Sequence, residues 1–325
     1  MTLRIGVLGA SRIAESAIVG PAAELGHRLV AVAARDPQRA SEFAQKYGVE
    51  RALGSYAEVV DDAEVDVIYN PLANALHAPW NLAAIAAGKP VLTEKPFANN
   101  RAQAAEVAAA AEASGVTVLE GFHYLFHPVT RRALDIAGDG TLGELQRVEV
   151  LMTMPEPADT DPRWSLELAG GALMDLGCYG LHIMRMFAVL AGGAPQITRA
   201  TAVQRTPGVD QSCDVELSLP GGATGTARHT MVSDAYRFRF QVFGTEGNLL
   251  VHNFIKPHGD DRITITSPSG TRVERLGTRA SYTYQLEAFA AHVSDGGPLP
   301  IDTGDAVANM ALIDDAYRAA GMEPR

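Results

Sequence analysis

Two stretches of the sequence place chemically capable side chains at fixed positions. In the first, Glu94-Lys95-Pro96 follows the apolar run Val91-Leu92-Thr93. Proline pushes the residue before it toward extended conformations, so Lys95 is expected at a strand end rather than inside a helix. Open parallel sheets bind ligands at strand ends, where a held lysine can act as a donor or a fixed cation. Taken alone, the tripeptide also fits a surface turn with a solvated charge pair.

The second stretch runs from Gly170 to His182 and follows the pair Arg163-Trp164. A helix that begins near Gly171 would carry Asp175, Tyr179 and His182 at positions i, i+4 and i+7. Those three polar side chains would share one face of the helix. The alternative is a half-buried amphipathic helix whose tyrosine and histidine make structural hydrogen bonds.

The start of the chain predicts a turn that could hold a dinucleotide. The apolar run Leu3 to Gly9 is followed at once by a helical segment from Ala10 to Glu15. Strand, tight turn and helix form the opening unit of a dinucleotide-binding fold. The glycine fingerprint is incomplete, since Gly9-x-Ser11-x-x-Ala14 replaces two of its three glycines. Ser11 would have to donate a hydrogen bond to the pyrophosphate or shift it, and an ordinary strand–helix turn is the alternative.

The residue after the second strand bears on which cofactor would bind. The predicted strand His27–Ala34 ends where an acidic residue usually holds the ribose 2′-hydroxyl, and Arg35 follows instead. A guanidinium group there suits a 2′-phosphate, with Arg39 or Arg12 assisting. The sequence therefore predicts NADP rather than NAD, against the alternative that Arg35 only caps the strand.

These groups need a scaffold, and residues 1–122 supply an alternation of short apolar strands and helices. Such alternation is typical of a parallel α/β sheet, so we expect a Rossmann-type, doubly wound dinucleotide-binding domain. One strand ends at Pro71 in a polar cluster formed by Asn70, Asn74 and His77. The expected elements are helices at 36–48, 56–63, 79–87 and 100–114, and strands at 66–71 and 116–121.

Residues 123–325 change to a period of two after a helix at 129–137. Val148, Val150 and Met152 alternate with polar residues, and similar runs recur at 213–219 and 236–242. We expect a C-terminal α+β domain with a large, mainly antiparallel sheet. Helices at 282–294 and 305–320 close the chain, and the last is expected to pack back on the first domain. The outer sheet face suits a homodimer interface or a solvated surface.

Composition limits the possible partners. The 325 residues include 38 acidic and 27 basic side chains, for a formal charge of -11. This balance opposes binding to nucleic acid or anionic membranes. Two cysteines, scattered histidines and no recognised metal motif argue against a disulfide framework or a metal site. With no signal peptide and no uncharged run of about 18 residues, we expect a cytoplasmic protein.

Over essentially its whole length, the sequence resembles the Gfo/Idh/MocA oxidoreductases. The matching motifs are Gly9–Ala14, Pro71–His77, Glu94–Pro96 and the stretch from Gly170 to Tyr179. Tyr179 makes the chain similar to the branch with glucose–fructose oxidoreductase, dimeric dihydrodiol dehydrogenase, NADP-dependent xylose dehydrogenase and anhydrofructose reductase.

The resemblance implies hydride transfer between a nicotinamide cofactor and an alcohol or carbonyl carbon of a sugar, polyol or cyclic diol. The accompanying proton needs an acid or base, for which Tyr179 is the candidate. Tyrosine ordinarily has a pKa near 10, and the Lys95 ammonium would lower it; Asp175 would orient Tyr179 or bind a substrate hydroxyl. The implied cofactor contacts are Gly9, Ser11, Arg12, Ile13, Arg35, Arg39, Pro71, Asn74, His77, Glu94 and Lys95. The implied substrate contacts are His123, Tyr124, Arg163, Trp164 and His182.

Two other functions remain open on the same motifs. One is a dinucleotide-binding regulator that has lost catalysis, although retention of both Lys95 and Tyr179 favours an enzyme. The other is an enzyme that retains NADP tightly and moves hydride between two sugars. The segment Gly121–Leu125 departs from many relatives, which have larger apolar residues and an arginine there, so the particular substrate stays open.

Overall fold

The computed structural model describes residues 1–325 and divides them into two compact units. The first unit comprises Met1–His123 and Tyr282–Val307, and the second comprises Tyr124–Ser281 and Ala308–Arg325. Helix α9 (Thr303–Ala319) therefore begins in the first unit and continues in the second.

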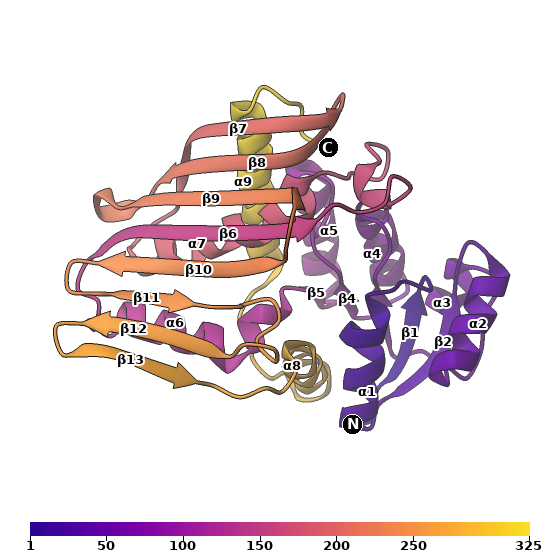
Figure 1. Cartoon of the computed structure of the whole chain (residues 1–325). Coiled ribbons are helices and arrows are strands. Elements are labelled where there is room, and N and C mark those ends of the chain that lie inside the picture. The colour runs from indigo at the N-terminus through magenta and orange to yellow at the C-terminus, as the bar shows by residue number, and fades with distance from the viewer. The chain divides into compact units, whose positions relative to one another are not determined.

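A five-stranded parallel sheet forms the centre of the first unit (Figure 1). Its order is β2-β1-β3-β4-β5, which confirms the predicted Rossmann-type sheet. The chain passes to one side of β1 with β2 and to the other side with β3. The carboxyl ends of β1 and β3 therefore form the switch point at which such sheets bind nucleotides. The strands are β1 (Arg4–Leu8), β2 (Arg28–Ala33), β3 (Val67–Asn70), β4 (Val91–Thr93) and β5 (Val118–Glu120).

The helices of this unit begin and end at residues suited to caps. Asp36 accepts a hydrogen bond at the start of α2, and Asn100 does so at the start of α5. Gly48 and Gly115 end the same two helices in the left-handed conformation. The helical segments are a π-helix at Glu15–Val19, α1 (Gly20–Leu25), α2 (Pro37–Tyr47), α3 (Tyr56–Asp61), a 3₁₀ turn at Asn74–Leu76, α4 (His77–Ala86), α5 (Arg101–Ser114) and α8 (Ser281–Asp295).

The second unit is built on an eight-stranded sheet in the order β13-β12-β11-β10-β6-β9-β8-β7. Neighbouring strands are antiparallel except β6 and β9, which pair in parallel, so the expected mainly antiparallel sheet is confirmed. The strands are β6 (Leu145–Pro155), β7 (Gln196–Thr206), β8 (Val209–Ser218), β9 (Thr224–Ser233), β10 (Arg237–Gly244), β11 (Asn248–Val251), β12 (Arg262–Ser267) and β13 (Gly270–Arg275).

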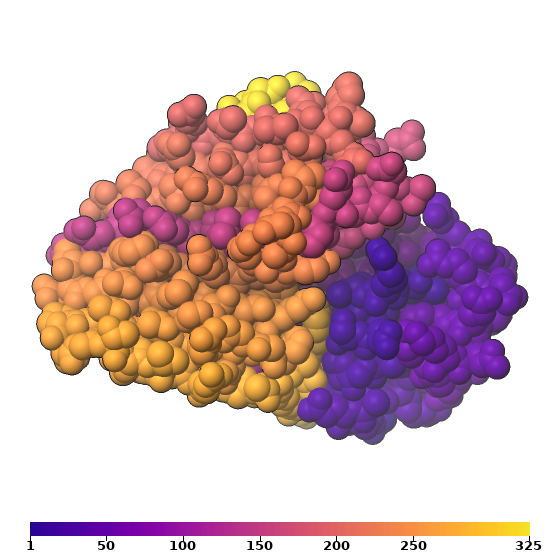
Figure 2. Space-filling view, viewed as in Figure 1, coloured from indigo at the N-terminus to yellow at the C-terminus, as the bar shows by residue number.

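Helices cover one face of this sheet. Val148, Val150 and Met152 of β6 are buried on that face, against α7 (Cys178–Leu190). Helix α6 (Pro128–Gly138) packs on β11 and β12, and α9 lies behind the other end of the sheet (Figure 1). The atoms of the opposite face form the surface toward the viewer in Figure 2.

The helix expected from Gly171 differs from a regular α-helix in its first turn. Residues Leu173–Gly177 form a π-helix, and α7 follows without a break at Cys178. A π turn takes an extra residue, and such turns occur frequently at functional sites. Asp175 lies inside this turn, and Tyr179 is the second residue of α7.

Candidate functional site

The turn after β1 has the backbone expected of a nucleotide-binding loop. Gly9 has φ +93°, and its N–H donates to the Ala33 carbonyl at 2.7 Å. This φ favours glycine, and a Cβ on Gly9 would also approach Leu72 Cδ2 to 2.9 Å, so the end of the Leu72 side chain would have to shift. Ser11 Oγ is buried without a hydrogen-bond partner in the protein. At this position, a buried hydroxyl without a partner can donate a hydrogen bond to a ligand acceptor such as a phosphate oxygen.

Basic side chains gather at the same turn. Arg39 of α2 reaches back, and its Nη2 donates to the Ala10 carbonyl at 2.9 Å. Arg35 and Arg12 are exposed, while the Asp36 carboxylate accepts from Gln38 N at the start of α2. The acidic residue nearest Arg35 in sequence is thus engaged in capping.

His77 joins the loops that follow β3 and β4. Its Nδ1 lies 2.7 Å from the Pro96 carbonyl oxygen and its Nε2 lies 2.9 Å from the Leu72 carbonyl oxygen. Burial lowers the pKa of His77 to about 4, by more than these carbonyls raise it, so the ring is neutral at pH 7. The neutral ring carries one N–H and therefore donates to one of these two carbonyls, while its buried ring packs between the Asn74 loop and the loop of Lys95.

The strand end that carries Lys95 is fixed from both sides. Tyr69 donates its hydroxyl to Glu94 Oε1 at 2.9 Å, and burial raises the pKa of Tyr69 well above its usual value. Glu120 Oε1 accepts from the Phe97 N–H at 2.8 Å. Strand β4 ends at Thr93 and Lys95 is half-buried two residues later, as the proline that follows it predicts.

In the second unit, Asp175 is engaged by an arginine from the preceding loop. Arg163 Nε donates to Asp175 Oδ2 at 2.7 Å, and Arg163 Nη1 lies 3.2 Å from Asp161 Oδ1. The two carboxylates raise the pKa of Arg163 further, with the charge of Asp175 the largest cause. One cation between two anions leaves this cluster with a net negative charge.

Tyr179 packs in an aromatic cluster. Its ring lies edge-on to Tyr124 at 5.8 Å and to Phe254 at 6.4 Å between ring centroids. Tyr124 and His182 are fully buried, and the Tyr124 hydroxyl lies 2.6 Å from His182 Nδ1. The structure therefore brings together three of the residues predicted for catalysis and substrate binding. His123 belongs to the first unit, where it stacks on Tyr282 at 3.9 Å.

Trp164 is held by its surroundings in the loop before Gly170. The Arg205 guanidinium carbon lies 4.4 Å from the centre of the Trp164 ring, whose Nε1 donates to the Pro157 carbonyl at 3.3 Å. Arg205 also pairs with Glu156 and Asp159. The loop is therefore acidic, and its cations are already paired with carboxylates.

Sequence reasoning missed several residues that support these groups. Tyr69 had a signal, since it is a hydroxyl-bearing residue beside Asn70 at the end of an apolar strand. Asp161 had a local signal too, since it stands two residues before Arg163. Phe254 had none, because its partners Tyr124 and Tyr179 lie far away in the chain. Lys95 and Tyr179 belong to different units.

Other features lie apart from these residues. The structure contains no group of three or more His, Cys, Asp or Glu side chains that could hold a metal ion, and Cys178 and Cys213 are both buried and form no disulfide. One helical stretch, Leu173–Leu190, is long and apolar enough to span a membrane, but 72% of it is buried in the protein, as in a core helix.

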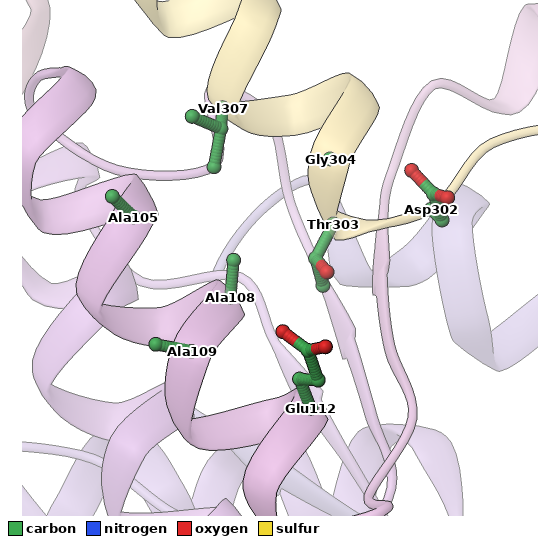
Figure 3. A pocket seen from close by; sticks show the side chains of 8 residues that line it. All are labelled: Ala105, Ala108, Ala109, Glu112, Asp302, Thr303, Gly304 and Val307. Carbon is green, nitrogen blue, oxygen red and sulfur yellow. The ribbon is translucent and has the colours of Figure 1, made fainter.

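A pocket in the first unit lies between α5 and the start of α9 (Figure 3). Two carboxylates, Glu112 and Asp302, line it together with small side chains, and it contains none of the predicted site residues. The remaining lining residues are Ala105, Ala108, Ala109, Thr303, Gly304 and Val307.

Models of known protein families match both parts of the chain. Residues 3–122 match the model of an oxidoreductase family with an NAD-binding Rossmann fold, GFO_IDH_MocA. Residues 130–250 match the GFO/IDH/MocA C-terminal domain.

Similar proteins include enzymes that act on sugars and diols. The chain is 32% identical over 323 residues to D-xylose 1-dehydrogenase (NADP(+)) 2 of Haloferax volcanii, covering 98% of this chain and 97% of that protein. It is 35% identical over 264 residues to trans-1,2-dihydrobenzene-1,2-diol dehydrogenase of Mus musculus, covering 79% and 77%. Among solved structures, the 3-ketoreductase KijD10 from Actinomadura kijaniata, in complex with NADP and TDP-benzene, superposes with a TM-score of 0.90. The identity is 27%, and 98% of each chain is covered.

Proposed function

The chain belongs to the Gfo/Idh/MocA family of oxidoreductases, and from this premise we propose that it is an NADP-dependent enzyme acting on CH–OH groups. Its reaction moves a hydride between the cofactor and a hydroxyl or carbonyl carbon of a sugar, polyol or cyclic diol. The observation that carries the proposal is the phenol of Tyr179 at the start of α7, packed between Tyr124 and Phe254. Lys95 supplies an ammonium group at a strand end of the nucleotide-binding unit.

The first unit would hold NADP at the carboxyl ends of β1 and β3. The Gly9 turn and Ser11 Oγ would receive the pyrophosphate, with Arg12 beside it. Arg35 and Arg39 suit the 2′-phosphate because a guanidinium group binds phosphate oxygens in a bidentate manner. Ile13, Pro71, Asn74, His77 and Glu94 complete the proposed cofactor contacts. When bound, the nicotinamide ring accepts or supplies the hydride.

The protein's own residues handle the proton. In oxidation, Tyr179 takes the proton from the substrate hydroxyl, and in reduction it returns a proton to the developing alkoxide. An ammonium group beside a phenol favours the phenolate, and Lys95 has this role in the proposal. Asp175 is oriented by Arg163 and can accept a hydrogen bond from a second substrate hydroxyl.

The charges around Asp175 favour an uncharged substrate over a sugar nucleotide. Asp161, Arg163 and Asp175 together carry one net negative charge, and Arg205 is paired with two further carboxylates. A diphosphate would meet repulsion here, whereas sugar hydroxyls would find acceptors. Among its relatives, the chain is therefore closer in chemistry to the xylose and diol dehydrogenases. Tyr124, His123, Trp164 and His182 would shape the rest of the substrate site.

A screen of NAD(P)H absorbance tests the proposal, using neutral aldoses, ketosugars, cyclic diols and a dTDP-sugar with each cofactor. We expect turnover of a neutral substrate with NADP and little with NAD. No turnover of any substrate, together with tight NADPH binding, would instead identify a regulator of the same fold. NADP that stays bound through purification, with transfer between two sugars, would identify the cofactor-retaining alternative.

We also propose a homodimer formed through the outer face of the eight-stranded sheet, in the cytoplasm. Leu151 and Leu250 are half-buried on this face, among charged residues such as Arg239 and Glu149. Light scattering after size exclusion tests the dimer: Leu250→Asp should yield monomers if this face is the interface, and an unchanged mass of the wild-type assembly would exclude it.

A further inference from the structure

A buried ion pair contacts the backbone of the turn that precedes the Tyr179 helix. Arg325 Nη2 donates to Asp210 Oδ1 at 2.8 Å, and their side chains are 2% and 0% exposed. Tyr317 of α9 donates its hydroxyl to the same oxygen at 3.0 Å, and the Arg325 guanidinium carbon lies 4.2 Å from the centre of the Tyr317 ring.

The same pair holds both ends of the turn. Arg325 Nε donates to the Gly170 carbonyl at 2.9 Å, and Asp210 Oδ2 accepts from the Leu173 N–H at 2.7 Å. Burial raises the pKa of Asp210 from its usual value, but three donors face its oxygens, which suits the ionised carboxylate at neutral pH. The guanidinium and the carboxylate thus bind the backbone on the two sides of Gly171.

The turn itself is conformationally costly. Ala169 has φ +56° and Gly171 has φ +129°, both in the region that favours glycine. A Cβ on Gly171 would lie 2.1 Å from Asp210 Oδ1 and 2.8 Å from Arg325 Nη2. Such a backbone persists only where its surroundings hold it, and here the ion pair does so.

From the turn, the hydrogen bonds lead directly to the proposed site. The Gly171 N–H donates to the Arg163 carbonyl, and the Asp175 N–H donates to the Gly171 carbonyl, each at 3.0 Å. The Arg163 side chain in turn donates from Nε to Asp175 Oδ2 at 2.7 Å. Tyr179 follows one turn later, so the placement of its phenol depends on this backbone.

We propose that Arg325 is a positioning residue which, through Asp210 and Tyr317, fixes the 169–173 turn and with it Asp175 and Tyr179. The proposal rests on the proposed function for its kinetic consequence, although the clamp itself can be measured without activity. Arg325 touches no reacting atom and acts through the backbone. A displacement of about 1 Å from far away can cost about 100-fold in rate.

The test compares Arg325→Lys with Arg318→Lys. Lysine keeps the charge but lacks the fork that reaches Gly170 and Asp210 together, whereas Arg318 is an exposed arginine of α9 paired with Asp315. We expect Arg325→Lys to lower kcat by about 10- to 100-fold, with KM and the NADPH dissociation constant within about threefold. Hydrogen–deuterium exchange should rise in peptides covering 170–179 and stay unchanged in 37–47. Arg318→Lys should leave all of these quantities unchanged.

If Arg325→Lys does not fold, Tyr317→Phe tests the proposal instead, because it removes only the hydrogen bond from Tyr317 to Asp210. It should raise exchange at 170–179 and lower kcat less than the lysine variant. Unchanged exchange and kcat in the folded variants, even with a lower melting temperature, would overturn the clamp and leave the proposed function intact. A wild-type protein that turns over no substrate would defeat the proposed function, and the exchange data alone would then decide the clamp.

Discussion

The contact between Gly180 and His229 sets how closely the Tyr179 helix can approach the sheet. A Cβ on Gly180 would lie 2.2 Å from His229 Nε2 and 3.2 Å from two ring carbons. The ring is fully buried on β9, and its Nδ1 lies 3.0 Å from the Cys213 carbonyl oxygen. Moving either the ring or the helix backbone to accommodate a methyl group at this position would therefore cost stability.

Gly180→Ala should accordingly destabilise the protein. Alanine gains about 1 kcal/mol over glycine inside a helix, but overpacking a core costs about 1–3 kcal/mol, and so close an approach belongs at the upper end. The net loss of about 2 kcal/mol corresponds to a fall in melting temperature of about 4–8 °C for a unit of this size. Since Tyr179 must move with the helix, kcat should fall as well.

Gly138→Ala is the matched control, since Gly138 is the last residue of α6 in the same unit and its Cβ would approach Leu190 only to 3.9 Å. Differential scanning calorimetry of both variants, and of Gly180→Ala combined with His229→Ala, measures the effect. The double variant should lose less stability than the sum of the losses of the two single variants, because the alanine methyl group no longer meets the His229 ring. A Gly180→Ala protein as stable as Gly138→Ala would refute the argument from packing.

Two further predictions concern pH and cofactor choice. Burial lowers the pKa of His229 to about 4, against 6.5 in the unfolded chain, so the neutral ring stabilises the fold above pH 6.5. That contribution to the free energy of unfolding, about 3 kcal/mol, is lost as the pH falls from 6.5 to 4. Urea unfolding across this pH range should show the loss. In His229→Asn the loss over the same range should be smaller. Arg35→Ala should weaken NADP binding by about 10- to 100-fold and NAD binding far less. Equal weakening in a fluorescence titration would contradict the 2′-phosphate assignment.

Local patterns predicted much of the first unit. The apolar run before Gly9, the helical segments that begin at Asp36 and Asn100, and the proline after Lys95 are each local features of a few residues. The structure has the corresponding strands and helices close to the expected positions, except that the segment expected to be helical from Ala10 to Glu15 is mostly a turn and the helix begins near Glu15. Period-two patterning likewise predicted β6, β8 and β10, because alternation and one-sided burial have the same cause.

The contacts that fix the candidate site in the second unit could not be predicted in this way. Asp210 and Arg325 are 115 positions apart, and Tyr124 and His182 are 58 positions apart. Nothing in their neighbouring residues specifies such partners. The π turn that contains Asp175 also has no distinct composition, since the same residues would form a regular α-helix.

Steady-state kinetics of Tyr179→Phe decide whether Tyr179 carries the proton in a nicotinamide-dependent reaction. With the best substrate from the screen, we expect a loss in kcat of about 100- to 10,000-fold, an unchanged NADPH dissociation constant, and normal activity in the exposed control Tyr236→Phe. A Tyr179→Phe protein that folds, binds NADPH and retains wild-type kcat would contradict this role of Tyr179.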